Sequence, residues 1–264
     1  MAVHPLEAKQ LLDGRLFTKV DPMTATFILN YMVACGYVLS EEQADIELVL
    51  PTWYKSAWRP ASRQMGGVYK AGKIRIWTTA LIHEALHSLL SDHNSGTLRG
   101  YPGFTLLSEA IASCSEIYFL LTVIGKLGLN KTTAKYYASM QKIEARHGRS
   151  YLRLFNKAAK DPYKSFKQAV SELNSLYLLA LKANDPAARN FKGFQEAISK
   201  MELFPFISNF DIGNNILFVQ ANCGPQPIPH DQIVCQKIWR ILDESELFVD
   251  FLGALERRPL KNQA

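Results

Sequence analysis

Residues 81–90, Leu-Ile-His-Glu-Ala-Leu-His-Ser-Leu-Leu, form an apolar segment that contains three side chains able to bind a metal ion. Its apolar residues recur at three- and four-residue intervals, which predicts a buried helix from Thr78 or Thr79 to about Leu90. Two histidines and a glutamate cost free energy in a buried helix unless a partner compensates them. The rest of the chain must therefore supply hydrogen-bond partners or a bound ion for these three side chains.

The three groups follow the pattern His-Glu-x-x-His, with His83, Glu84 and His87. Residues four apart lie one above the other on a helix, so both imidazoles can reach one ion. Such a pair suits Zn²⁺, which takes a third protein ligand and keeps a fourth position for water. Glu84 lies one step round the helix, where a carboxylate can take a proton from that water. The alternative is that no metal binds: both histidines are hydrogen-bonded within the core, and Glu84 is exposed to solvent.

The third ligand has two candidates. His93 follows His87 by six residues, which is the spacing of the elongated metzincin motif, but Leu90 stands where that motif has a glycine. A bulky residue is poorly suited to the positive φ of a sharp turn. Glu109 is the better candidate, because it lies in an apolar segment that predicts a second long helix, from about Thr105 to Lys126.

The segment 107–112, Leu-Ser-Glu-Ala-Ile-Ala, resembles the gluzincin clan of zinc metallopeptidases. In that clan the third ligand is a glutamate on the helix after the active-site helix, so the resemblance implies that Glu109 binds the metal. A further glutamate seven residues on, Glu116, matches the pattern of the aminopeptidase branch and is expected to orient a ligating histidine. The resemblance covers about residues 66–120.

The chain also departs from the aminopeptidase branch. Ala110 and Ser108 replace the usual glycine and asparagine, and twenty-one residues separate His87 from Glu109. The Gly-Ala-Met-Glu-Asn substrate-binding motif of that branch is missing. The resemblance therefore implies a zinc peptidase of gluzincin type and leaves its substrate specificity open.

The fold class expected from these patterns is α+β and zincin-like. Residues 1–126 would form a small mixed subdomain with the two site helices, and residues 127–264 a mainly helical subdomain that closes the cleft. Alternating residues in 66–77 predict a hairpin. Its second strand, Lys73 to Trp77, would either be an edge strand that pairs with extended substrate or an ordinary cover for the core.

A zinc peptidase also needs a donor that stabilises the oxyanion after attack on the carbonyl. Tyr137 and His147 are preferred, because they lie on a predicted helix expected to form the far wall of the cleft. The other candidates are Tyr118, Tyr136, Tyr151 and His230. Most such residues in helices are simply packed in the core, so the sequence leaves this role open.

The formal net charge is +6, and we interpreted the basic residues as spread along the chain, so no nucleic-acid partner is expected. The four cysteines lack CxxC spacing, and neither a secretory signal nor a run long enough to span a membrane is found. A cytoplasmic location is the default expectation, with export that needs no cleavable signal as the alternative.

The sequence thus predicts a Zn²⁺-dependent peptidase that acts on a peptide or protein substrate with Glu84 as general base. One alternative is a catalytically silent zincin-like scaffold that acts as a protein-interaction module. Another is a basic, mainly helical protein that binds a nucleic acid or an anionic surface, for which salt-sensitive retention on heparin or DNA is the discriminating test. The oligomeric state is not predicted.

Overall fold

The described structure consists mainly of helices around one core. The computed structural model describes residues 21–34, 38–40, 46–49, 68–70, 73–76, 78–91, 102–127, 151–183, 196–197, 200–203 and 229–257. The helices within these ranges are α3 (Pro22–Ala34), α4 (Thr78–Ser91), α5 (Pro102–Leu127), α8 (Tyr151–Ala158), α9 (Pro162–Ala183), α13 (Pro229–Glu244) and α14 (Phe248–Arg257).

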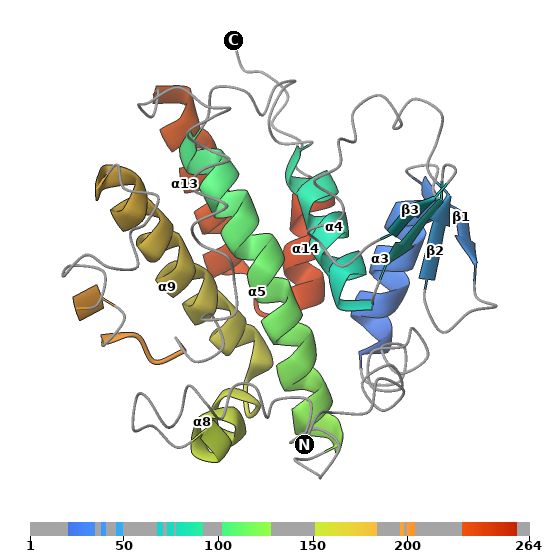
Figure 1. The fold of residues 1–264 in the computed structure, drawn as a ribbon, viewed down its shortest axis with the longest axis horizontal. Helices are drawn as coiled ribbons and strands as arrows, with labels where there is room; N and C mark the ends of the chain where they lie inside the picture. The colour runs from blue at the N-terminus through green and yellow to red at the C-terminus, as the bar shows by residue number, and fades with distance from the viewer. Residues whose placement is uncertain are drawn as a thin grey trace.

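Helix α5 is the central element of the fold (Figure 1). Its 26 residues span about 39 Å at a rise of 1.5 Å per residue. Helices α4, α9 and α13 all pack against it. Most of its described side chains are buried, including those on successive positions such as Leu106, Leu107 and Ser108. A helix that is apolar nearly all round is stable only inside a core, which explains why α5 lies between other helices.

Aromatic rings join α5 to α9 and α14. The ring of Tyr118 on α5 stacks on Phe248 with their centroids 4.1 Å apart. Phe248 meets Phe166 of α9 edge to face, at 4.9 Å between centroids. Contacts of this geometry add stability beyond the apolar area that they bury. The C-terminal helices are thereby attached to the same core that contains the site helices.

Four short strands pair in an antiparallel sheet at one end of the molecule (Figure 1). They are β1 (Val38–Ser40), β2 (Ile46–Val49), β3 (Val68–Lys70) and β4 (Lys73–Ile76), in the spatial order β1-β2-β4-β3. The register pairs Leu39 with Leu48, Leu48 with Ile74, and Ile74 with Tyr69.

The α+β zincin-like fold class predicted from the sequence is wrong. The described residues are overwhelmingly helical. The strands are only three or four residues long. Long helices that bury one another supply the stabilising apolar area here, so the architecture is a helical assembly with a small peripheral sheet.

Of the two expectations for the second strand of the hairpin, the edge strand that pairs with substrate is contradicted. Strand β4 pairs with β2 through Ile46 and Ile76, and with β3 through Tyr69 and Ile74. Its backbone groups are therefore engaged on both sides, and a substrate strand cannot pair with it without displacing a neighbour. Among the described strands, β1 and β3 are the edges of the sheet. Trp77, the last residue of the predicted strand, lies outside the described residues.

The subdomain boundary predicted at residue 126 falls at the end of α5. Side chains from both sides of it belong to one buried cluster, for example Leu86 and Ile111 before it and Phe166 and Phe251 after it.

None of the described helices combines the length and the apolar character that a membrane span requires.

Gly125, near the end of α5, allows a close approach of two segments. A Cβ at this position would lie 2.9 Å from the backbone oxygen of Ala159. We expect Gly125→Ala to lower the free energy of unfolding by about 1–3 kcal/mol, because a backbone oxygen cannot move aside as a side chain can. Chemical denaturation of the purified protein measures this change.

Gly253 on α14 is the matched control. A Cβ there would meet nothing within 4 Å. Because alanine is the better helix former, Gly253→Ala should raise the stability by about 0.5–1 kcal/mol. Equal effects of the two substitutions would contradict the close packing of α5 against the segment that follows α8.

Candidate metal centre

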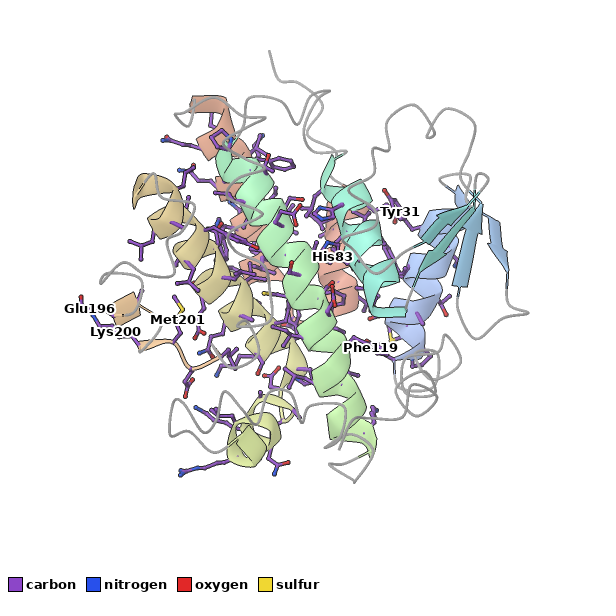
Figure 2. All side chains as sticks on the ribbon, in the orientation of Figure 1. Tyr31, His83, Phe119, Glu196, Lys200 and Met201 are labelled. Atoms are coloured by element: carbon purple, nitrogen blue, oxygen red, sulfur yellow. The ribbon has the colours of Figure 1, made fainter. Side chains whose placement is uncertain are left out.

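Two histidines of α4 lie against each other on the side of the helix that faces α5. The Nε2 atoms of His83 and His87 are 3.1 Å apart, and the ring centroids are separated by 4.7 Å. One helical turn between them produces this arrangement. His83 is buried and His87 half-buried, and Figure 2 shows the His83 label between α4 and α5.

Helix α5 brings a carboxylate to the two rings. Glu109 Oε1 lies 3.5 Å from His87 Nε2. Ligand atoms of His83, His87 and Glu109 all lie within 4.8 Å of one another, and this is the group of possible metal ligands found among the described residues. The three positions predicted as the metal ligands are therefore brought together.

The donor spacing fits a zinc ion. Tetrahedral zinc with bonds of about 2.0–2.1 Å places neighbouring ligand atoms about 3.3 Å apart. Two of the three separations, 3.1 Å between the imidazoles and 3.5 Å between His87 and Glu109, lie on either side of this value, and all three ligand atoms lie within 4.8 Å of one another. Two imidazole nitrogens and a carboxylate oxygen also form a donor set that zinc accepts in hydrolytic sites.

Each histidine has an oxygen beside its other ring nitrogen. Ser108 Oγ lies 3.0 Å from His87 Nδ1, and Glu116 Oε1 lies 3.2 Å from His83 Nδ1. Only the contact of Ser108 with His87 is a hydrogen bond; Glu116 lies close to His83 Nδ1 without hydrogen-bond geometry. When Ser108 accepts from His87, the proton is held on Nδ1 and the Nε2 lone pair is available for a metal. The structure thus shows the contact between Glu116 and a site histidine that the sequence analysis expected.

Ser108 is a site residue that the sequence analysis noted only as a departure from the family pattern. It precedes Glu109 directly, and the resembling helices carry asparagine at this place. Both serine and asparagine offer an oxygen acceptor. This shared property is the sequence feature that indicates a hydrogen-bonding role for Ser108. Which histidine Ser108 contacts depends on the packing of α5 on α4.

Burial keeps His87 neutral. Removal from water lowers the pKa of its imidazole from 6.5 to about 4; the charge of Glu109 acts in the opposite direction and His83 in the same direction. An imidazole with this pKa is unprotonated at pH 7, which is the state that binds a metal. The environment of His87 therefore favours a neutral imidazole that can bind a metal over a protonated imidazole that pairs with Glu109.

Other predicted site residues fall on parts whose side chains are not described. Glu84 belongs to α4 beside His83, and its backbone alone is described. Tyr137, His147 and His93 lie outside the described residues. Tyr137 and His147 therefore stay predictions for the oxyanion donor.

Tyr118 has a structural role in the helical core. Its hydroxyl donates to Asp21 Oδ2 at 2.5 Å, and the other carboxylate oxygen of Asp21 accepts the backbone N–H of Thr24 at the start of α3. Burial first, and then the charge of Asp21, raise the pKa of Tyr118 far above its usual value. This tyrosine links α5 to α3 and does not serve as an oxyanion donor at the histidines.

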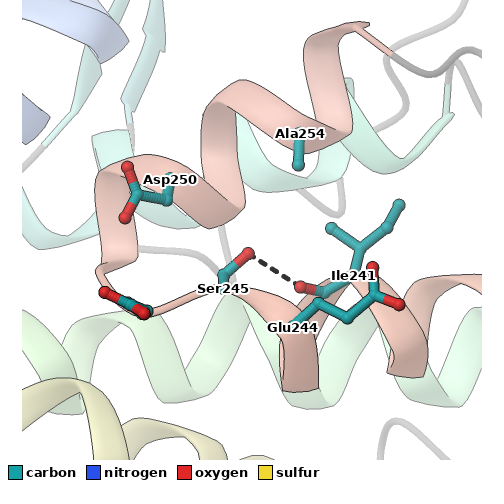
Figure 3. A pocket seen from close by; sticks show the side chains of 6 residues that line it. Ile241, Glu244, Ser245, Asp250 and Ala254 are labelled. Atoms are coloured by element: carbon teal, nitrogen blue, oxygen red, sulfur yellow. Dashed lines mark hydrogen bonds between the residues drawn. The ribbon is translucent and has the colours of Figure 1, made fainter.

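A surface pocket of about 360 Å³ lies elsewhere, between the end of α13 and α14 (Figure 3). Its wall includes Ser245, whose hydroxyl donates to the backbone oxygen of Ile241 at 2.7 Å. None of the metal-ligand candidates lines it; the lining residues are Ile241, Glu244, Ser245, Glu246, Asp250 and Ala254.

The chain was compared with protein-family models, with curated proteins and with solved structures, and none of the three comparisons found a match. The functional argument therefore rests on the side chains of the site.

The contact between Ser108 and His87 leads to a testable prediction. We expect Ser108→Ala to weaken zinc binding by about 10- to 100-fold, because the imidazole loses the acceptor that orients it. Competition with a chromogenic zinc chelator measures the affinity.

Ser115→Ala is the matched control on the same helix. The Ser115 hydroxyl donates to the backbone oxygen of Ala112, and neither atom belongs to the site. This variant should bind zinc as the wild type does. Equal losses in both variants would show that any removed hydroxyl of α5 disturbs the helix, and would contradict the orienting role.

Proposed function

We propose that the chain is a zinc-dependent hydrolase of peptide bonds. The observation that supports this most strongly is the convergence of His83, His87 and Glu109 from two adjacent helices, with the Ser108 hydroxyl hydrogen-bonded to the outer nitrogen of His87. The sequence resemblance to gluzincin peptidases points to the same ligands. The proposed substrate is a peptide or protein.

Each residue has a distinct part in the proposed mechanism. His83 and His87 hold the ion as neutral donors, and Glu109 contributes a negative charge that offsets part of the charge of the ion. Zinc supplies Lewis acidity, which makes a water more acidic and polarises a carbonyl group. Glu84, next to His83 in α4, takes a proton from the attacking water and returns it to the leaving nitrogen. No covalent acyl-enzyme is formed.

Partial exposure of the ligands favours a catalytic site over a structural one. The side chains of His87 and Glu109 are 21% and 16% exposed. Within the described parts of the chain, no fourth histidine, cysteine or acid completes the group. Structural zinc sites have four protein ligands, whereas catalytic sites keep a position for water. A silent scaffold with an enclosed ion is therefore the less favoured alternative.

Replacement of the proposed base separates binding from catalysis. We expect Glu84→Gln to keep stoichiometric zinc and to lose peptidase activity by at least about 100-fold, because glutamine cannot accept the proton. Cleavage of a peptide library, analysed by mass spectrometry with and without a chelator, gives the activity. A variant that retains full turnover would refute the role of Glu84.

Replacement of a ligand tests the site itself. We expect His87→Ala to lose zinc, since only His83 and Glu109 would remain of the group. Elemental analysis of the purified protein measures the metal content, and Ser115→Ala, which removes a hydroxyl that donates to the backbone of α5 itself, should keep it. Wild-type protein with bound zinc but no cleavage of any peptide would instead support the silent scaffold.

A further inference from the structure

The positive charge of the chain is concentrated in one segment. Residues 126–167 contain eleven lysines and arginines but only two acidic residues, which is a formal charge of +9. The whole chain carries +6, so the remaining residues together carry −3. The expectation that no nucleic acid binds rested on charge spread along the chain, and this distribution contradicts that premise.

The described part of this segment forms one corner of the molecule. Helix α8 leads through residues 159–161 into α9, and the end of α5 packs against the same place, where Gly125 approaches Ala159. Figure 1 shows α8 at the lower end of the molecule, beyond the end of α9. Five exposed cations lie here and are called the basic corner: Lys126, Arg153, Lys157, Lys160 and Lys164.

Hydrogen bonds fix the backbone of the basic corner. Asp161 Oδ1 accepts the backbone N–H of Lys164 at 2.9 Å, and the Ser165 hydroxyl donates to the backbone oxygen of Ala158 at 2.9 Å. The cations therefore project from a defined turn between two helices. A surface arranged in advance loses less conformational entropy when it binds a partner.

The acidic groups nearby are already engaged. Asp161 caps α9, and Glu202 forms an ion pair with Lys157 and accepts a hydrogen bond from Gln168. Lys126, Lys160 and Lys164 form no ion pair with any residue that the structure describes. Most of the charge of the basic corner is thus directed to solvent and not neutralised within the described fold.

The basic corner is separate from the metal centre. Glu109 and Lys126 both lie on α5, seventeen positions apart, which corresponds to about 26 Å along the helix. This distance exceeds the range of about 8–10 Å over which charges interact in physiological salt. The cations therefore serve neither the zinc ligands nor the peptide bond bound there.

We propose that the basic corner binds the phosphodiester backbone of a nucleic acid. A nucleic acid presents a dense row of negative charges, about one per 1.7 Å of duplex axis, which matches a rigid cluster of cations. Four of the five cations are lysines, which contact phosphates as point charges without a fixed geometry. The binding is therefore expected to be independent of the base sequence.

A membrane surface fits the basic corner less well. Proteins that bind anionic membranes through a helix also insert apolar side chains beneath the headgroups. The large hydrophobic residues that are exposed in the described structure are Met23, Leu178, Ile233 and Leu247. None of them lies on the first turns of α9, and the two apolar side chains of α8 that the structure describes, Leu154 and Ala158, pack against the core.

Charge reversal in the full-length protein tests the proposal. Lys160→Glu with Lys164→Glu changes two exposed positions at the start of α9, where acidic residues are compatible with the helix dipole. Lys237→Glu with Arg240→Glu is the matched control, because it makes the same change in net charge at exposed positions on α13. Fluorescence anisotropy with a labelled 25-base-pair DNA duplex and a labelled 25-nucleotide RNA measures binding between about 50 and 200 mM NaCl.

We expect the wild type to bind at least one of the two probes, with affinity that falls steeply as salt rises. The Lys160/Lys164 variant should bind at least about tenfold more weakly, and its salt dependence should decrease by about two in log–log slope. The Lys237/Arg240 variant should bind as the wild type does. A chelator should leave all three affinities unchanged, because the metal centre is distant.

Four results would overturn the proposal: no binding to either probe, equal losses in the two variants, equally tight binding of poly-glutamate, or equally tight binding of phosphatidylserine vesicles. Equal losses would show an effect of net charge alone. Poly-glutamate binding would assign the corner to acidic polypeptides, and vesicle binding would assign it to a lipid surface. These results are independent of peptidase activity, so the two proposals succeed or fail separately.

Discussion

The packing of α4 on α5 is the contact on which the site depends. It buries His83 and half-buries His87 in an otherwise apolar interface, which would cost free energy if their polar atoms had no partners. The cost is reduced because α5 places oxygens near both rings: the Ser108 hydroxyl is hydrogen-bonded to His87, the Glu109 carboxylate lies beside the same ring, and the Glu116 carboxylate lies near His83. The same contacts that make burial tolerable also orient the ring nitrogens toward one point. Stability and metal-binding geometry therefore have a common origin here.

Helix α5 also links regions with different chemistry. One part of it carries the acidic ligand Glu109, and its end reaches the basic corner at Lys126. Between them, Tyr118 attaches α3 through Asp21 and α14 through Phe248. A single rigid helix thus sets the positions of a proposed hydrolytic centre and a proposed polyanion-binding surface.

Sequence reasoning was most successful where local periodicity decides the geometry. Two histidines four residues apart on a helix must share a face, and the structure places their Nε2 atoms 3.1 Å apart. Reasoning about the fold class was wrong, because short alternating segments were taken to define a mixed subdomain, whereas most of the described residues belong to helices. The strands exist as a peripheral sheet, yet the register places Lys73–Ile76 inside it rather than at its edge. Pairing order depends on contacts between distant segments, which period-two patterns do not encode.

By itself, the sequence determined that residues 81–90 form a helix with two imidazoles on one face, and that eleven basic residues accumulate between 126 and 167. Both properties are local, since they follow from the order of residues along a short segment. Only the tertiary structure decided which acid meets those imidazoles, which serine orients His87, and which cations share one corner. The contacts of His83 and His87 with α5 join residues twenty or more positions apart, and Lys126 lies equally far along the chain from the other cations of the basic corner. These relations are set by how apolar helix faces pack rather than by any pattern within one helix.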